Sequence, residues 1–75
     1  MEVRVQLYGA FRKPARDPEF ACRVEEGTTV GELMERLKLP APGFRMALVN
    51  DIRVPESAVL KPGDEVRLFP PVGGG

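Results

Sequence analysis

Two segments near the beginning of the chain alternate between apolar and polar residues. The first covers residues 2–8 and the second covers residues 20–25, and in both every second residue is apolar. A period of two is typical of a β-strand that buries one face. The residues between them, 9–18, include a glycine, two prolines and four charged side chains. We therefore expect a loop there, which joins the two strands into an antiparallel hairpin.

A helix is predicted to begin at Thr29. Thr29 and Glu32 form a Thr-x-x-Glu capping box, in which each side chain bonds the backbone N–H of the other residue. The following residues carry one apolar stripe at helical spacing, formed by Val30, Leu33, Met34 and Leu37. Pro40 and Pro42 end the pattern, because proline has no backbone N–H to donate. A helix this short is marginal alone, so we expect it to pack on a sheet.

Three further segments complete the predicted sheet. Residues 45–49 form a third strand, an Asn-Asp turn at 50–51 leads to a short fourth segment at 52–54, and residues 65–69 form a fifth strand. The turn at residues 61–64 places proline and glycine at the two centres of a type II turn. The pattern predicts an α+β fold, with a mixed sheet of four to five strands and one main helix packed on one face.

Composition limits the class of function. A chain of 75 residues forms one domain, which is too small to enclose a deep active site beside its core. Eleven basic and eleven acidic residues give a formal net charge of zero, which argues against nucleic-acid or membrane binding. No apolar segment is long enough to cross a bilayer or to act as a signal peptide, so we expect a cytoplasmic protein.

The inventory of reactive side chains argues against a stand-alone enzyme. The chain has no histidine, one cysteine and no glycine motif of the kind that binds nucleotide phosphates. We therefore expect no metal and no cofactor on this chain, and we expect any ATP to bind to a partner.

The C-terminal residues are the strongest candidate for chemistry. The last predicted strand runs into Pro70-Pro71, which cannot extend a sheet ladder and hold the chain extended. We expect residues 1–72 to form the domain and the glycines at 73–75 to form a flexible tail. Glycine allows a backbone to approach a partner's active site closely. The α-carboxylate of Gly75 is ionised at neutral pH and becomes an acyl donor only after activation, for example by adenylation. A frayed or inert end is the alternative interpretation.

Two aromatic residues form a second candidate site. Tyr8 and Phe69 fall in the outward phase of their strands, among polar neighbours. If those strands are adjacent, the two rings form a binding patch near the root of the tail. Two unrelated surface aromatics are the alternative, because exposed aromatic residues are common.

The remaining candidates are weaker. Cys22 shares the phase of its apolar neighbours, so we expect it in the core rather than as a reactive thiol. Four arginines are expected on the solvated face of the sheet: Arg4, Arg23, Arg45 and Arg67. Arg12, Lys13 and Arg16 make the predicted loop basic, which fits a solvated loop or, more specifically, a contact with an acidic partner.

Several of these segments together resemble the MoaD family, the small subunits of molybdopterin synthase. The matching segments are Phe11-Arg12, Ala47-Leu48-Val49-Asn50, Gly63-Asp64-Glu65-Val66, Phe69-Pro70-Pro71-Val72 and the terminal Gly74-Gly75. The resemblance covers essentially the whole chain, is most specific at the ending, and implies a ubiquitin-like β-grasp fold. Related thiamine sulfur carriers share the double glycine but usually lack the Phe-Pro-Pro-Val lead. Gly73 departs from the family, which commonly has Ala, Ser or Thr there.

The resemblance implies a sulfur carrier. An adenylating enzyme of the ubiquitin-activating type uses MgATP on Gly75, and a sulfur donor such as a cysteine desulfurase or rhodanese converts that residue to a thiocarboxylate. A MoaE-like large subunit then receives the tail, and sulfur passes to a pterin precursor for dithiolene formation in molybdenum cofactor biosynthesis. Besides Gly75 and Gly74, the implied partner-binding residues are Tyr8, Phe69, Pro70, Pro71, Val72 and Gly73. Three alternatives stay open: a sulfur carrier for tRNA thiolation or thiamine, a ubiquitin-like modifier of proteins, and a binding module with an inert tail.

Overall fold

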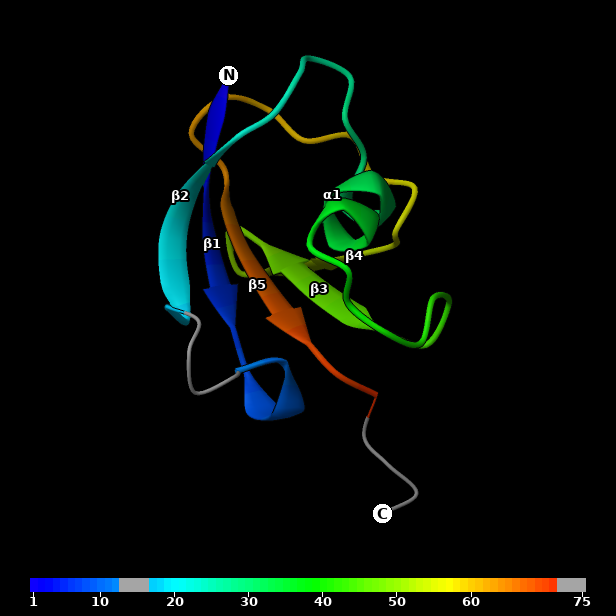
Figure 1. Ribbon diagram of the computed structural model, residues 1–75. Helices are drawn as coiled ribbons and strands as arrows, with labels where there is room; N and C mark the ends of the chain where they lie inside the picture. Colours follow the sequence, from blue (N-terminus) through cyan, green and yellow to red (C-terminus); the bar gives the residue numbers. More distant parts are fainter. Residues whose placement is uncertain (13–16, 72–75) are drawn as a thin grey trace.

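The computed structural model describes residues 1–12 and 17–71 (Figure 1). Its elements are β1 (Glu2–Leu7), the 3₁₀ helix η1 (Gly9–Phe11), β2 (Glu19–Arg23), α1 (Val30–Arg36), β3 (Met46–Val49), β4 (Ile52–Val54) and β5 (Glu65–Phe69). The strands form one five-stranded sheet in the order β2-β1-β5-β3-β4. β1 and β5 run parallel, whereas the other neighbouring pairs are antiparallel. The predicted mixed sheet, including the first hairpin, is confirmed.

The core lies between α1 and the face of the sheet that this helix covers (Figure 1). Its buried apolar side chains are Val3, Val5, Leu7, Phe11, Val24, Val30, Leu33, Met34, Leu39, Ala47, Leu60, Val66 and Leu68. Within the strands these are the alternate residues that the sequence pattern assigns to one face. Cys22 packs against this cluster in the predicted phase but is only half-buried, so its expected place in the core is confirmed in part.

Local signals set the ends of the helix and the turns. The Thr29 hydroxyl accepts a hydrogen bond from the Glu32 N–H at 3.1 Å, and the Glu32 carboxylate accepts one from the Thr29 N–H at 2.9 Å. The predicted capping box is therefore present. Gly63 has a φ of 80°, as the central glycine of a type II turn requires. Asn50 and Asp51 have φ values of 52° and 69°, which fit the two-residue turn that joins β3 to β4.

The expected loop at residues 9–18 holds a short helix that the sequence pattern missed. Residues 9–11 form η1, and Phe11 at its end is buried in the core. Phe11 carries no periodic signal, because it is a single large apolar residue between Ala10 and Arg12. The basic residues Lys13 and Arg16 lie outside the described part of the chain.

Arg45 is the one predicted surface arginine that the structure places in the interior, so that prediction is wrong. Its side chain is 1% exposed and forms ion pairs with Glu35 at 3.0 Å and Glu56 at 2.7 Å. It also donates a hydrogen bond to the Leu39 carbonyl oxygen at 2.7 Å. Arg45 precedes β3 in the inward phase of Ala47, and the two carboxylates make burial of its charge tolerable. The other three arginines lie on the outer face.

Candidate functional site

The two outward aromatic residues lie against each other at one end of the sheet. Tyr8 follows β1 directly and Phe69 ends β5, and these two strands are parallel neighbours. The ring centroids are 4.5 Å apart and the ring planes differ by 15°, which is a stacked arrangement. The Tyr8 N–H donates to the Leu68 carbonyl oxygen at 3.0 Å, so the backbone also fixes this position. The predicted adjacency is confirmed, and the docking role of the pair stays a prediction.

Two aliphatic residues extend the aromatic pair across the outer face. The register of β3 against β5 places Met46 opposite Phe69 and Leu48 opposite Arg67. Residues that are directly opposite in a sheet share a face, and Met46 and Leu48 are half-buried there. We call Tyr8, Phe69, Met46 and Leu48 the docking patch. It lies on the face of the sheet that α1 does not cover.

Gln6 organises the polar side of the docking patch, and the sequence analysis did not single it out. Its side-chain oxygen accepts hydrogen bonds from the Tyr8 hydroxyl at 2.9 Å and from Arg67 Nε at 3.1 Å. Its amide nitrogen donates to Glu19 at 2.6 Å. The sequence signal that could have identified Gln6 was its outward phase in the strand, between Arg4 and Tyr8. Gln6 therefore holds both an aromatic ring and a cation of the outer face in place.

Pro70 leaves the sheet beside η1. β5 ends at Phe69, as expected of a strand followed by two prolines, and Pro70 is half-buried whereas Pro71 is exposed. Gly9 has a φ of 56°, and a side chain there would place its Cβ 3.0 Å from Pro70 Cγ. The absence of a side chain at Gly9 thus makes room for Pro70. The predictions for Val72, Gly73, Gly74 and Gly75, and the domain boundary at residue 72, fall outside the described residues.

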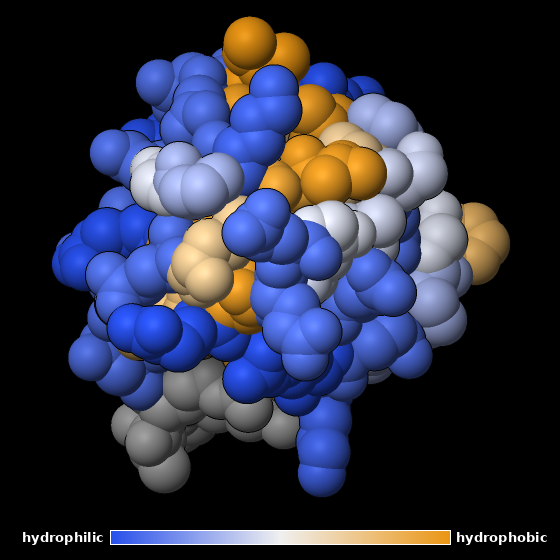
Figure 2. All heavy atoms as spheres, turned by 90° about the horizontal axis from the view of Figure 1, so that it is seen from above, coloured by the Kyte–Doolittle hydropathy of each residue, from blue (hydrophilic) through white to orange (hydrophobic). Residues whose placement is uncertain are grey.

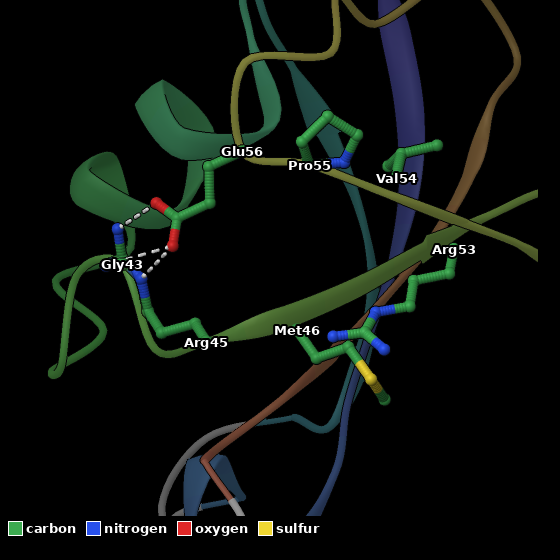
Figure 3. A pocket seen from close by; sticks show the side chains of 7 residues that line it. All are labelled: Gly43, Arg45, Met46, Arg53, Val54, Pro55 and Glu56. Carbon is green, nitrogen blue, oxygen red and sulfur yellow. Dashed lines mark hydrogen bonds and ion pairs between the residues drawn. The ribbon is translucent and has the colours of Figure 1, made fainter.

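A groove of about 620 Å³ continues from the Met46 side of the docking patch. It is lined by Gly43, Arg45, Met46, Arg53, Val54, Pro55 and Glu56. Figure 3 shows the ion pair between Arg45 and Glu56 at one end, and the side chains of Met46 and Arg53 close together at the other. Glu56 also accepts a hydrogen bond from the Gly43 N–H at 2.9 Å.

The ion pair between Arg45 and Glu56 determines the electrostatics at its end of the groove. The hydrogen bond from Arg45 holds the pKa of the Glu56 carboxyl below its ordinary value of 4.5, and the Gly43 N–H adds to the effect. Since both charges are paired, this end of the groove has no free reactive group. In residues 1–12 and 17–71, no cluster of three His, Cys, Asp or Glu side chains is placed to hold a metal ion.

The end of the molecule away from Tyr8 and Phe69 has a mostly hydrophilic surface (Figure 2). Figure 2 views the end that is uppermost in Figure 1, where hydrophilic residues make up most of the surface and hydrophobic residues form a narrower band. No helix among the described residues is both long enough and apolar enough to cross a membrane.

Two relatives match this chain over nearly their whole length. The molybdopterin synthase sulfur carrier subunit of Mycobacterium tuberculosis is 35% identical over 82 residues, which cover 100% of this chain and 99% of that protein. Small archaeal modifier protein 3 of Haloferax volcanii is 29% identical over 92 residues, which cover 100% of both chains.

Solved structures share the fold. The putative molybdopterin converting factor subunit 1 from Pyrococcus furiosus has a TM-score of 0.75 and 28% identity, covering 95% of this chain and 98% of that one. A complex of subunits 1 and 2 of the molybdopterin-converting factor from Helicobacter pylori contains a chain with a TM-score of 0.62 and 27% identity, with 100% of both chains covered. These similarities confirm the β-grasp architecture. Residues 5–75 also match the model of the ThiS family, and the chain therefore belongs to that family.

Proposed function

We propose that this chain is the sulfur carrier subunit of a molybdopterin synthase and carries sulfur as a thiocarboxylate on Gly75. The observation that carries the proposal is the position of the docking patch. One of its residues, Phe69, is followed directly in the chain by Pro70 and the C-terminal segment. Family membership and the full-length relative from Mycobacterium tuberculosis support the same function.

The chemistry requires activation of the Gly75 carboxylate by a partner. A carboxylate oxygen attacks the α-phosphorus of ATP and pyrophosphate leaves, which gives an acyl-adenylate. A persulfide sulfur then attacks the acyl carbon and AMP leaves. Reductive cleavage of the resulting acyl disulfide by a thiol releases the thiocarboxylate and forms a disulfide. MgATP binds to the adenylating enzyme, and a cysteine desulfurase or rhodanese supplies the persulfide.

The roles of this chain's residues follow from their positions. The stacked rings of Tyr8 and Phe69 bind a MoaE-like large subunit, because stacked aromatic residues lose little conformational entropy when they are covered. Pro70 and Pro71 direct Val72 and the glycines toward that partner's active site, and Gly73 and Gly74 pass through a narrow entrance because they lack side chains. Catalytic side chains for sulfur transfer lie on the large subunit, and we place the reaction in the cytoplasm.

A second candidate function is protein modification. The relative named small archaeal modifier protein 3 aligns over the full length of both chains. In that case an amine, rather than a persulfide, attacks the same acyl-adenylate, and Gly75 forms an amide with a lysine of another protein.

Mass spectrometry of the protein isolated from its own cells tests the proposal. We expect a fraction in which sulfur replaces one terminal oxygen, and we expect the large subunit of a molybdopterin synthase to co-purify. Adducts on the lysines of other proteins support the modifier instead. A terminus that stays unmodified after incubation with the adenylating enzyme, ATP and a persulfide donor contradicts both functions.

A further inference from the structure

The outer face of the sheet carries one arginine on each of β1, β2, β4 and β5. Two of them form an ion pair with a carboxylate, and a third lies opposite a glutamate in the strand register. Arg4 pairs with Glu19 at 3.0 Å, Arg67 pairs with Asp51 at 3.0 Å, and Arg23 lies opposite Glu2 in the register of β1 and β2. The positive charges of this face are therefore largely balanced within the domain.

Arg53 is the exception. It lies on the edge strand β4, where the register places it opposite Leu48, an apolar member of the docking patch. The side chain is exposed, and within the part of the chain that the structure describes it has no hydrogen bond or ion pair. A guanidinium beside aliphatic groups and without a carboxylate is an unbalanced charge on an otherwise balanced face.

Arg53 also lies where the docking patch continues into the groove. Met46 belongs to both surfaces, and its side chain lies close to that of Arg53 (Figure 3). A partner that covers Phe69 and Met46 therefore also covers Arg53. Removing a guanidinium from water is costly unless an opposite charge with matching geometry replaces the water.

We propose that Arg53 determines which partner docks, by binding an Asp or Glu side chain of the synthase large subunit. This inference rests on the proposed function, because it assumes that the docking patch contacts that subunit. Two features favour a carboxylate of a protein over a phosphate of a nucleic acid. The neighbours of Arg53 in the sheet are apolar, and two other cations of this face, Arg4 and Arg67, already have acidic partners. A planar guanidinium also binds a carboxylate through two parallel hydrogen bonds.

Charge reversal at Arg53, compared with a matched reversal elsewhere, tests the inference. Arg53→Glu and Arg23→Glu make the same change in net charge on the same face, but Arg23 lies on β2 at the opposite edge of the sheet. Calorimetric titration measures the affinity of each variant for the large subunit from the same organism, at low and at high salt. We expect Arg53→Glu to weaken binding by about 30-fold or more at low salt, with a smaller loss at high salt. We expect Arg23→Glu to change it by less than about threefold.

Two further variants separate charge from packing. Arg53→Lys keeps the charge but not the two parallel hydrogen bonds, so its affinity is expected to lie between those of the unaltered chain and Arg53→Met, which keeps the length but removes the charge. In the large subunit, replacing the paired Asp or Glu by Arg is expected to restore binding of Arg53→Glu. Equal affinities for Arg53→Glu and Arg23→Glu, with normal binding by the unaltered chain, overturn the role of Arg53 and leave the proposed function standing. If the unaltered chain does not bind the large subunit at all, the proposed function fails as well.

Discussion

At the residue scale, the outer face works because a few polar contacts hold apolar groups in a fixed arrangement. Gln6 accepts from both Tyr8 and Arg67, and the rings of Tyr8 and Phe69 stack at 4.5 Å. The alternation of the sequence places Tyr8 and Phe69 outward correctly. It gives no information about the stacking, because their contact depends on the pairing of β1 with β5.

Replacing Phe69 with alanine is expected to weaken binding to the large subunit more than it weakens the fold. Phe69 is only half-buried in the free chain, so we expect a loss of about 1 kcal/mol in the free energy of unfolding. Binding is expected to lose about 2 kcal/mol or more, since a central aromatic anchor is removed. Chemical denaturation and calorimetric titration measure the two quantities. Val59→Ala is the control. Val59 is also an exposed apolar residue, but it lies beside Thr29 at the start of the helix and not in the docking patch. A collapsed fold in Phe69→Ala contradicts the assignment.

Gln6 gives a prediction that depends on coupling rather than on loss alone. Gln6→Met keeps the length of the side chain but leaves the Tyr8 hydroxyl without its acceptor, and Tyr8→Phe removes that hydroxyl. We expect each change to weaken docking, and the double variant to lose about 0.5–1 kcal/mol less than the sum of the two. A double-mutant cycle of binding affinities measures this difference. Strict additivity shows that Gln6 does not position the ring.

At the element scale, one buried cation connects α1, the segment that follows α1 and the segment that follows β4. Arg45 pairs with Glu35 of α1 and with Glu56 after β4, and it bonds the Leu39 carbonyl oxygen in the segment that follows α1. Individual elements were predictable because capping boxes, stripes and alternation are local signals. The ion pairs of Arg45 were not predictable from the sequence. Glu35, Arg45 and Glu56 lie in different segments, and each resembles an ordinary surface charge.

The ion pair between Arg45 and Glu56 predicts a loss of stability in acid. The pKa of Glu56 is lower in the folded chain than its ordinary value of 4.5, so the unfolded chain binds the proton more tightly. The stabilisation by Glu56 is therefore fully present above that ordinary value and is lost as the pH falls through the lowered pKa. Urea denaturation at a series of pH values from about 7 down to about 3 is expected to show this decline.

Two carboxylate variants test the source of that decline. Glu56→Gln is expected to lower stability at neutral pH by about 2 kcal/mol and to flatten the acid decline, because it leaves a buried guanidinium with less compensation. Glu35→Gln is the matched control: its carboxylate binds the same guanidinium, but its side chain is 66% exposed against 26% for Glu56. We therefore expect a smaller effect. The same loss in both variants assigns the pH dependence to the guanidinium as a whole rather than to Glu56.

At the scale of the whole molecule, the described core and the proposed reactive group lie in different parts of the sequence. The buried apolar residues lie between Val3 and Leu68, whereas the proposed chemistry takes place at Gly75. The fold class was predictable from the sequence, because one helix and a hairpin among further strands allow few architectures. The order of strands was not, since the parallel pairing of β1 with β5 connects the two ends of the chain without a local signal.

Deleting Gly75 is expected to abolish formation of the thiocarboxylate and to leave the thermal midpoint of unfolding almost unchanged. The physical reason is that the buried apolar residues in the described part of the chain extend only as far as Leu68. Intact-mass analysis after incubation with the adenylating enzyme measures loading, and calorimetry measures the midpoint. A chain extended by one alanine after Gly75 is the control, because it keeps every residue but moves the carboxylate. A large fall in the midpoint shows instead that the terminal residue supports the fold.

The parallel pairing of β1 and β5 has a mechanical consequence. The two strands lie side by side in the middle of the sheet, and the chain enters through one and leaves through the other at the opposite end. Tension on the C-terminal segment, with the N-terminal end held, therefore acts along the length of this ladder. Such a force shears its hydrogen bonds all together instead of unzipping them one by one. A partner can therefore bind the C-terminal segment and pull on it while the domain resists mechanical unfolding.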